Sequence, residues 1–192
     1  MSVKGLSWTL LRYHRENGEG IDKFDAETAA VHHSKLCIAL EILHECFVTM
    51  IEPYTESDLV ADLLFNRESE LNRLNFWGFY TMILERGDEL VSVATFRVYG
   101  NKVAEMPLIG TDPQHRRQGM CRLLVNELEK LLSALGVERL LLPAVPQLLK
   151  TWTGSFGFTE MTKSDRLELS KYTLLNFQDT IMCHKFIPVA PS

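Results

Sequence analysis

The order of segments in the sequence predicts an α/β protein, in which helices pack on the faces of a β-sheet. Between residues 76 and 109, short apolar runs are separated by Gly-Asp and Gly-Asn pairs, a pattern typical of an antiparallel meander. A leucine stripe at helical spacing follows in 119–135, and a further apolar run follows in 137–142. Strands, a helix and another strand in this order indicate a mixed sheet with helices on its faces.

The first 65 residues are expected to contribute one strand and two helices. Aromatic and apolar residues fill 6–14 and favour a strand, whereas the asparagine and glycines after it favour a polar loop. In 34–50, Leu36, Leu40, Leu43 and Phe47 recur at spacings of four, three and four, as on one face of a helix. The expected elements are a strand at 6–14, a loop at 15–27, a helix at 34–50 and a shorter helix at 58–65 with Ser57 as its N-cap.

The central and C-terminal parts supply the remaining strands. The pairs Gly87-Asp88 and Gly100-Asn101 divide the meander into three strands, and Gly136 suits the end of the leucine-rich helix. We therefore expect six to seven strands and about four helices. The elements expected here are strands at 76–85, 89–98, 102–109, 137–142, 159–161 and 179–186, a helix at 119–135 and a weaker helical segment at 146–156.

Length and composition fit one soluble globular domain. The chain has 192 residues, of which 46% are hydrophobic and 23% charged. We expect a single domain over 1–192, with an N-terminal strand and loop in 1–33 and a loose tail in 188–192. The formal net charge of -5 argues against binding DNA or RNA through phosphate attraction. It is compatible with a cationic partner and equally with solubility alone.

Several other classes of protein are not indicated. Cys37, Cys46, Cys121 and Cys183 lie far apart without a CxxC pair, so neither a zinc site nor a disulfide framework is predicted. The histidines have no carboxylate or cysteine at a metal-binding spacing, and we expect no metal. No signal-peptide pattern occurs, and no apolar run approaches the roughly 20 residues of a membrane span. An intracellular protein is expected.

Residues 105–122 carry the strongest functional signal. The chain runs from a strand through a turn at Asp112-Pro113 to two adjacent arginines, and then into the helix that begins at Gly119. A helix start presents backbone N–H groups and the positive end of the helix dipole, and glycine lets a ligand approach the backbone closely. Physical chemistry leaves two interpretations: a seat for a pyrophosphate, or a basic helix cap on a solvated loop.

The motif Arg116-x-x-Gly119-x-Cys121 resembles the acyl-CoA-binding signature of the GNAT acetyltransferases. That signature reads Arg or Gln, two residues, Gly, one residue, and Gly or Ala. The phrases AEMPLIGT, RRQGMCRLL and FGF look most similar to the acetyltransferase domain of plant PHD-finger proteins of the increased-DNA-methylation type. The resemblance extends from about Leu36 to Phe186. It departs from the pattern at Cys121, for whose thiol we favour a packing role over a redox role.

The resemblance implies the GNAT fold, a mixed and mostly antiparallel twisted sheet, with acetyl-CoA as cosubstrate and no metal. It places backbone groups of Ile109, Gly110 and Thr111 beside the pantetheine arm, as an added strand would lie. Pro107 fits a strand that bulges to admit a ligand, or an ordinary edge position. The residues that the resemblance places around the pyrophosphate are Arg116, Arg117, Gln118, Gly119, Met120, Cys121 and Arg122.

Glu105 is the candidate general base. In histone-type GNAT enzymes, a glutamate fourteen residues before the signature glycine accepts the proton, and Glu105 has that offset from Gly119. Its neighbours in the sequence are apolar, so desolvation could raise its pKa towards a useful value. A backbone N–H near Ile109 would meet the oxyanion. The other interpretation is a glutamate on the exposed face of a half-buried strand.

The second proton-transfer group of many GNAT enzymes is missing. They use a tyrosine after the fifth strand to protonate the leaving thiolate, but 149–158 contains none, and Trp152 stands about where it is expected. An indole cannot act as that acid. Solvent protonates the thiolate, or activity is weaker than usual, or the domain binds acetyl-CoA without turnover. For Trp152 and Phe156 we favour core positions over ligand contacts.

The resemblance implies a lysine N-acetyltransferase that acts on histone tails in the nucleus, by direct attack of the deprotonated amine on the thioester. Acidic side chains would attract a basic tail, and the candidates are Glu52, Glu56, Asp58 and Asp62. Chromatin-complex proteins are further partners that the resemblance suggests; neither membrane binding nor direct nucleic acid binding is expected. Two alternatives stay open: a small amine or non-histone protein as acceptor, and an acetyl-CoA-binding interaction module without catalysis.

Overall fold

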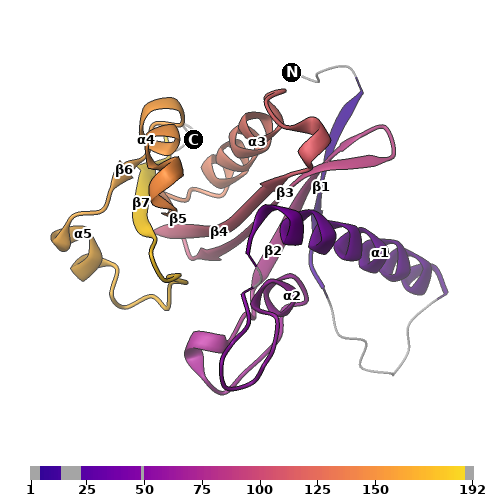
Figure 1. Cartoon of the computed structure of the whole chain (residues 1–192), viewed down its shortest axis with the longest axis horizontal. Coiled ribbons are helices and arrows are strands. Elements are labelled where there is room, and N and C mark those ends of the chain that lie inside the picture. Colours follow the sequence, from indigo (N-terminus) through magenta and orange to yellow (C-terminus); the bar gives the residue numbers. More distant parts are fainter. Residues whose placement is uncertain (1–4, 14–22, 49, 189–192) are drawn as a thin grey trace. The chain divides into compact units, whose positions relative to one another are not determined.

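The computed structural model describes residues 5–13, 23–48 and 50–188, with side chains from residue 27 onward in the second range. Its strands form one seven-stranded sheet in the order β1-β2-β3-β4-β5-β7-β6 (Figure 1). The elements are β1 (Leu6–Leu11), α1 (Lys23–Cys46), α2 (Leu59–Leu64), β2 (Phe79–Arg86), β3 (Glu89–Tyr99), β4 (Val103–Thr111), α3 (Met120–Ala134), β5 (Arg139–Ala144), α4 (Leu149–Ser155), β6 (Thr159–Glu160), α5 (Lys163–Glu168) and β7 (Ile181–Phe186).

Two compact units make up the chain. Unit 1 comprises residues 1–95 and 109–124, and unit 2 comprises residues 96–108 and 125–192. The sequence-based expectation of an α/β protein with six to seven strands is confirmed. That the chain forms a single domain remains a prediction.

Unit 1 is built on the antiparallel pair of β1 and β2, whose register runs from Leu6 opposite Arg86 to Leu11 opposite Thr81. Helix α1 contacts α2, and α2 contacts β2. The buried face of α1 carries Leu36 and Leu43, which are 1% and 0% exposed. Burial of these side chains is the main force that orders the helix.

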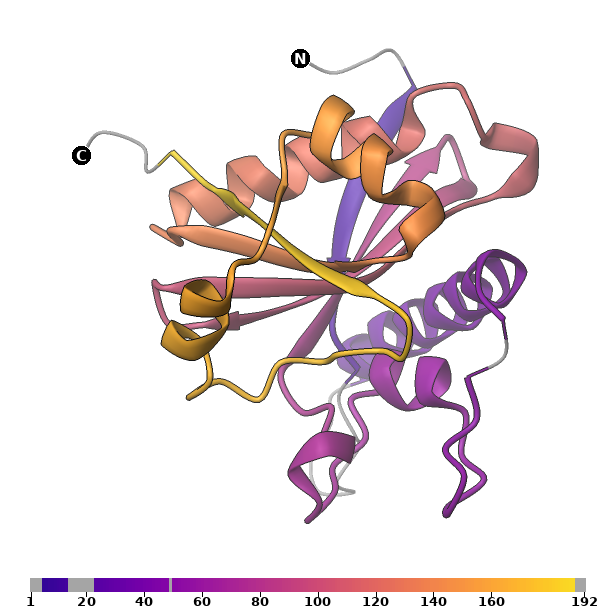
Figure 2. The ribbon, with the colours of Figure 1, turned by 60° about the vertical axis from the view of Figure 1, so that its left-hand side comes forward.

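Unit 2 is built on β5, which pairs in parallel with β4 and antiparallel with β7. In the parallel pair, Glu105 lies opposite Leu141 in the register. Figure 2 shows β7 running beside β5, with α4 near them. Strand β6 pairs with the other side of β7 and contacts α4. A cluster of buried side chains, Val103, Leu141, Met161, Leu169 and Met182, forms part of the core of this unit.

The N-terminal helix is longer than expected. Helix α1 begins at Lys23 rather than Ser34, so the prediction of a loop is wrong for residues 23–27, as is that of a strand and loop for 23–33. The physical reason is visible in the burial pattern: most described side chains from 27 to 33 are exposed, so this part of the helix carries no apolar stripe. Residues 14–22, and with them the rest of the expected loop, lie outside the described residues, as do 189–192 of the expected tail.

Two further differences concern short helices. The N-cap of α2 is Asp58 rather than Ser57, because the Asp58 carboxylate accepts hydrogen bonds from the N–H groups of Val60 and Ala61. Helix α5 was not expected from periodicity.

Over the part of the chain that the structure covers, no helix combines the length and apolar character that crossing a membrane would need.

Candidate functional site

The loop between β4 and α3 lies in unit 1 and is held by a small network around Asp112. The Asp112 carboxylate accepts a hydrogen bond of 2.8 Å from the Gln114 N–H and caps the 3₁₀ turn Pro113–His115. The buried His115 ring lies 3.1 Å from the same carboxylate through Nδ1, and 3.4 Å from Glu89 through Nε2. These contacts hold residues 112–115 in place, and the rest of the loop continues from them.

The backbone of the loop adopts the left-handed region twice before the helix begins. Arg117 has φ of 62° and Gly119 has φ of 82°. Only glycine adopts such values without steric cost, so Gly119 is required by conformation, and Arg117 is a strained position. A Cβ atom built at Gly119 meets no atom within 4 Å, which leaves the backbone there accessible to a ligand. The helix then starts with the bond from Leu123 N–H to Gly119 O.

The two adjacent arginines have different environments. The Arg116 guanidinium donates to Thr111 O at 3.1 Å through Nε, and to Cys46 Sγ at 3.4 Å through Nη2. It therefore braces the loop against the end of α1. Arg117 and Arg122 are exposed. Within the described part of the chain, the Arg117 guanidinium makes no hydrogen bond or ion pair, so it can turn towards a ligand without breaking a contact of the loop.

Gln118 and Met120 tie the loop to the end of β2. The Arg86 guanidinium donates to the Gln118 side-chain oxygen Oε1 at 3.4 Å and approaches Met120 Sδ at 3.7 Å. Gln118 in turn donates to Gln114 O at 2.9 Å. These side-chain contacts stabilise the loop conformation. The groups of this segment that remain for a ligand are therefore those of the backbone.

Ser92 and helix α1 hold the residues expected beside the pantetheine arm. The Gly110 carbonyl accepts a hydrogen bond of 2.8 Å from the Ser92 hydroxyl, which also lies 2.9 Å from Thr111 Oγ1. A Cβ atom at Gly110 would lie 2.9 Å from Cys46 Sγ and 3.1 Å from a methyl group of Leu43. Gly110 is thus required by the close approach of α1, a reason that the sequence alone did not suggest.

The side chain of Cys121 is half-buried. Burial raises its pKa to about 11, an effect that the nearby Arg122 charge opposes and Cys46 reinforces. A protonated thiol is a poor nucleophile and resists oxidation. This environment fits the packing role favoured from the sequence.

Glu105, in unit 2, is 3% exposed, so the interpretation as an exposed surface glutamate is wrong. Its Oε1 accepts hydrogen bonds from Arg97 Nε at 3.0 Å, Arg97 Nη2 at 2.8 Å and the Tyr99 hydroxyl at 2.9 Å. Its Oε2 accepts one from the Leu175 N–H at 2.7 Å. The Thr173 carbonyl accepts a further bond from Arg97 Nη2 and lies 2.6 Å from the Tyr99 hydroxyl, whose single proton is shared between Thr173 O and Glu105 Oε1. These contacts bind the segment before β7 to this cluster.

The two carboxylate oxygens of Glu105 differ in their remaining capacity. A carboxylate offers about two lone-pair positions on each oxygen. The two Arg97 donors already fill Oε1, whereas the single donor at Oε2 leaves that oxygen able to accept a proton. Burial raises the pKa of Glu105, and the Arg97 charge and the hydrogen bonds from Leu175 and Tyr99 oppose that rise.

Trp152 is a core residue of unit 2. It is 7% exposed, and its ring centroid lies 4.7 Å from that of Phe156 and 5.6 Å from that of Phe158. The preference for a core position over a ligand contact is confirmed for this residue.

The acidic side chains expected to attract a basic peptide serve mainly to hold unit 1 together. Glu52 is 1% exposed; burial favours its neutral form, but hydrogen bonds from Arg73, Thr55 and Tyr54 outweigh burial and lower its pKa to about 2. Asp62 pairs with Arg67 at 2.9 Å. Asp58 caps α2 and lies 2.6 Å from His44. Of the four candidates, Glu56 is exposed, and its side chain makes no hydrogen bond or ion pair with another described residue.

Sequence reasoning missed the partners of Glu105. Arg97 and Tyr99 stand two residues apart on β3, so period-two alternation puts them on one face and could have marked them as a pair. Thr173 and Leu175 gave no such signal. Within the described ranges, no three His, Cys, Asp or Glu side chains come together as a metal-binding group.

Comparisons with known proteins place the chain in a family. It is 41% identical over 184 residues to "Increased DNA methylation 1" of Arabidopsis thaliana, and the match covers 96% of this chain but only 16% of that protein. The crystal structure of Tetrahymena GCN5 is similar, with a TM-score of 0.68, 16% identity and coverage of 96% of this chain and 98% of that one.

Two further structures share the fold. The catalytic domain of the Tetrahymena GCN5 histone acetyltransferase in complex with coenzyme A has a TM-score of 0.59, 16% identity, and coverage of 95% and 93% of the two chains. The ribosomal-protein-S18-alanine N-acetyltransferase of Escherichia coli has a TM-score of 0.54, 18% identity, and coverage of 96% and 97%. At these identities the likeness concerns the fold, which is that of the GNAT acetyltransferases. The family model "Increased DNA methylation 1, C-terminal domain" matches residues 47–186, and the chain belongs to that family.

Proposed function

We propose that this chain is an acetyl-CoA-dependent lysine N-acetyltransferase. The observation that carries the proposal is the loop at 116–122, where left-handed backbone at Arg117 and Gly119 leads into the N-terminus of α3. Backbone N–H groups and the helix dipole at such a start favour an anionic ligand. Membership of the family and the GNAT fold support the same assignment.

In this proposal the loop holds the pyrophosphate of acetyl-CoA. The backbone of 118–122 and the exposed charges of Arg117 and Arg122 would bind the phosphates, while Arg116 keeps the loop in place. Backbone groups of Ile109 to Thr111 would pair with the pantetheine arm. Acetyl-CoA supplies an activated thioester, and the protein supplies orientation and proton transfer.

Glu105 is the proposed general base. A lysine ammonium must lose a proton before its nitrogen can attack the thioester carbon, and Oε2 of Glu105 can accept that proton, directly or through water. The C–N bond then forms, the C–S bond breaks and the CoA thiolate leaves. Because 149–158 contains no tyrosine and Trp152 is buried in the core, solvent would protonate the thiolate.

The proposed acceptor is a basic peptide such as a histone tail, and the proposed location is the nucleus. The name of the Arabidopsis relative refers to DNA methylation, and a similar structure is that of a histone acetyltransferase. The net charge of -5 favours a cationic acceptor. Proteins of chromatin complexes would be further partners, and a small amine or non-histone protein is the alternative acceptor.

One observation favours a second function, an acetyl-CoA-binding module without catalysis. The Glu105 carboxylate is tied to four donors, and an ion pair of this kind also serves to hold a fold together. The two functions differ in turnover but share the acetyl-CoA site.

Calorimetric titration with acetyl-CoA tests the shared site. Arg117→Ala should weaken binding roughly tenfold, the effect of losing one hydrogen-bonding charge. Arg166→Ala removes the same charge from an exposed position on α5 and should bind as the unmodified chain does. Equal affinity of all three proteins would refute the pyrophosphate loop.

A further inference from the structure

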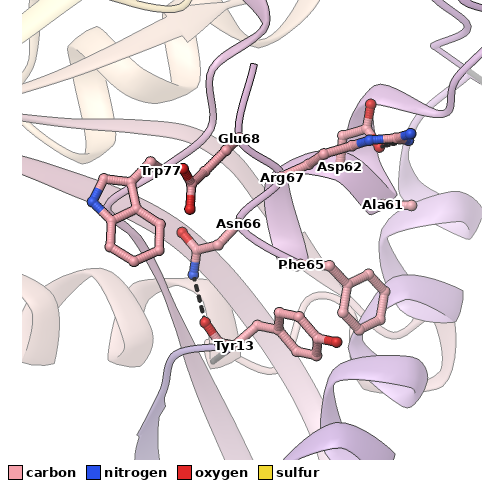
Figure 3. Close-up of a pocket in the computed structure, with 8 residues that line it drawn as sticks. All are labelled: Tyr13, Ala61, Asp62, Phe65, Asn66, Arg67, Glu68 and Trp77. Atoms are coloured by element: carbon pink, nitrogen blue, oxygen red, sulfur yellow. Dashed lines mark hydrogen bonds and ion pairs between the residues drawn. The ribbon is translucent and has the colours of Figure 1, made fainter. Parts of the chain in front are cut away.

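A cavity of about 550 Å³ lies in unit 1, outside residues 105–122 (Figure 3). Its wall combines three aromatic side chains, Tyr13, Phe65 and Trp77, with polar residues from the end of α2 and the segment after it. The rings of Tyr13 and Phe65 meet edge to face, with centroids 5.3 Å apart. The wall is therefore partly apolar and aromatic, and nothing in the proposed acetyl-CoA site accounts for it.

Asn66 leaves a buried acceptor in this wall. The residue is 6% exposed, and its Nδ2 donates to Tyr13 O at 3.3 Å. Its Oδ1 is buried and finds no donor among the residues that the structure describes. In Figure 3 the amide oxygen points away from Tyr13, on the side of Glu68 and Trp77. Since a buried acceptor without a donor is costly, this oxygen indicates a ligand that carries an N–H group.

The charged residues that line the cavity indicate what charge its ligand should carry. Arg67 and Asp62 neutralise each other at 2.9 Å, and Figure 3 shows both directed away from Glu68. Glu68 is exposed, and across the described ranges no cation forms an ion pair with it. Among the lining residues the Glu68 carboxylate thus has no ion-pair partner and is a group that can receive a cation.

The aromatic wall already contacts one cation of the chain. The Arg12 guanidinium lies over the Trp77 ring at 4.7 Å from its centroid and over Tyr80 at 5.2 Å. Its positive charge opposes a second cation at the Trp77 ring, so a cationic ligand depends on the Glu68 carboxylate and the Asn66 amide oxygen for its stabilisation. Aromatic faces, an acceptor and a carboxylate together form the usual environment of a lysine or arginine side chain.

We propose that this cavity binds a lysine or arginine side chain of a basic peptide. The cationic head donates to Asn66 Oδ1 and to the Glu68 carboxylate, and the methylene stem packs on Tyr13, Phe65 and Trp77. The inference rests on the proposed function, because the side chain belongs to the acceptor peptide and is a second one beside the lysine that is acetylated.

The test follows the Trp77 indole N–H signal by NMR, assigned with a Trp77→Phe variant. The probes are Nα-acetyl-lysinamide, Nα-acetyl-argininamide and the neutral Nα-acetyl-norleucinamide. A cationic probe should shift the signal saturably and the neutral probe should not. Glu68→Gln should weaken that binding roughly three- to fivefold, which is the effect of losing one solvent-accessible ion pair. Glu70→Gln, an exposed neighbour outside the lining, should leave it unchanged.

Failure of both cationic probes to shift the signal, or equal binding of cationic and neutral probes, overturns the inference. Acetylation of a lysine peptide by the same proteins separates the two proposals. If the signal shifts but no acetyl group is transferred, the proposed cavity site stands and the proposed acetyltransferase activity is contradicted. If acetyl transfer occurs without a shift, and Glu68→Gln has the same KM as the unmodified chain, the acetyltransferase activity stands and the cavity site is contradicted.

Discussion

Glu105 and Arg97 form a buried ion pair in unit 2. Their side chains are 4% and 11% exposed, and the shortest distance between them is 2.8 Å. Removing one member of a buried ion pair leaves the other charge buried without its partner, which typically costs 3–5 kcal/mol. Replacing both members removes that penalty. The stability of Glu105 variants therefore has to be separated from any loss of activity.

The free energy of unfolding measures this dependence. Glu105→Gln should lower it by about 3 kcal/mol in urea titrations, because Arg97 loses its counter-charge. The double variant Arg97→Gln with Glu105→Gln should lose clearly less than the two single losses combined, since the two sites are coupled. Additive losses would mean that the two side chains do not stabilise each other.

Helix α1 and strand β4 approach so closely that only glycine fits at position 110. A Cβ there would lie 2.9 Å from Cys46 Sγ and 3.1 Å from the Leu43 side chain. Gly110→Ala should therefore destabilise unit 1 by about 1–3 kcal/mol through overpacking, as measured by the same urea titration.

Gly154 provides the matched control for that substitution. It lies in α4, where an added Cβ meets no atom within 4 Å, so Gly154→Ala should stabilise the chain by roughly 0.5–1 kcal/mol. Equal effects of the two substitutions would contradict a tight contact between α1 and β4.

The elements that could be predicted are those with a strong local pattern. Alternation and glycine turns located the strands β2 to β4, and the leucine stripe located α3 within about one residue at each end. The first part of α1 escaped because its side chains are exposed and carry no apolar period. Helix α5 has another kind of signal, a capping box between Thr162 and Asp165, which was readable in the sequence.

The candidate site was predictable only where it is contiguous in the sequence. The loop from Arg116 to Arg122 is a single stretch, so its residues could be identified together. The environment of Glu105 could not be, because the Leu175 N–H that binds it lies 70 residues further along the chain. Likewise, the need for glycine at 110 comes from a contact with α1 and leaves no mark in the local sequence.

For the whole molecule, the acidic charge and the loop at 116–122 suit opposite partners. The chain carries a net charge of -5, which attracts a basic peptide, whereas the arginines and the start of α3 favour an anion. The proposed transfer of an acetyl group from acetyl-CoA to a lysine peptide would use both. The chain spans 16% of the length of its Arabidopsis relative.

Mass spectrometry of a lysine-rich histone-tail peptide incubated with acetyl-CoA tests the central claim most directly. The unmodified chain should add acetyl groups to lysine at neutral pH. The double variant Arg97→Gln with Glu105→Gln, in which no buried charge is left unpaired, should bind acetyl-CoA but acetylate at least about 10²-fold more slowly. Acetylation by the double variant at the original rate, or none by an unmodified chain that binds acetyl-CoA, would contradict it.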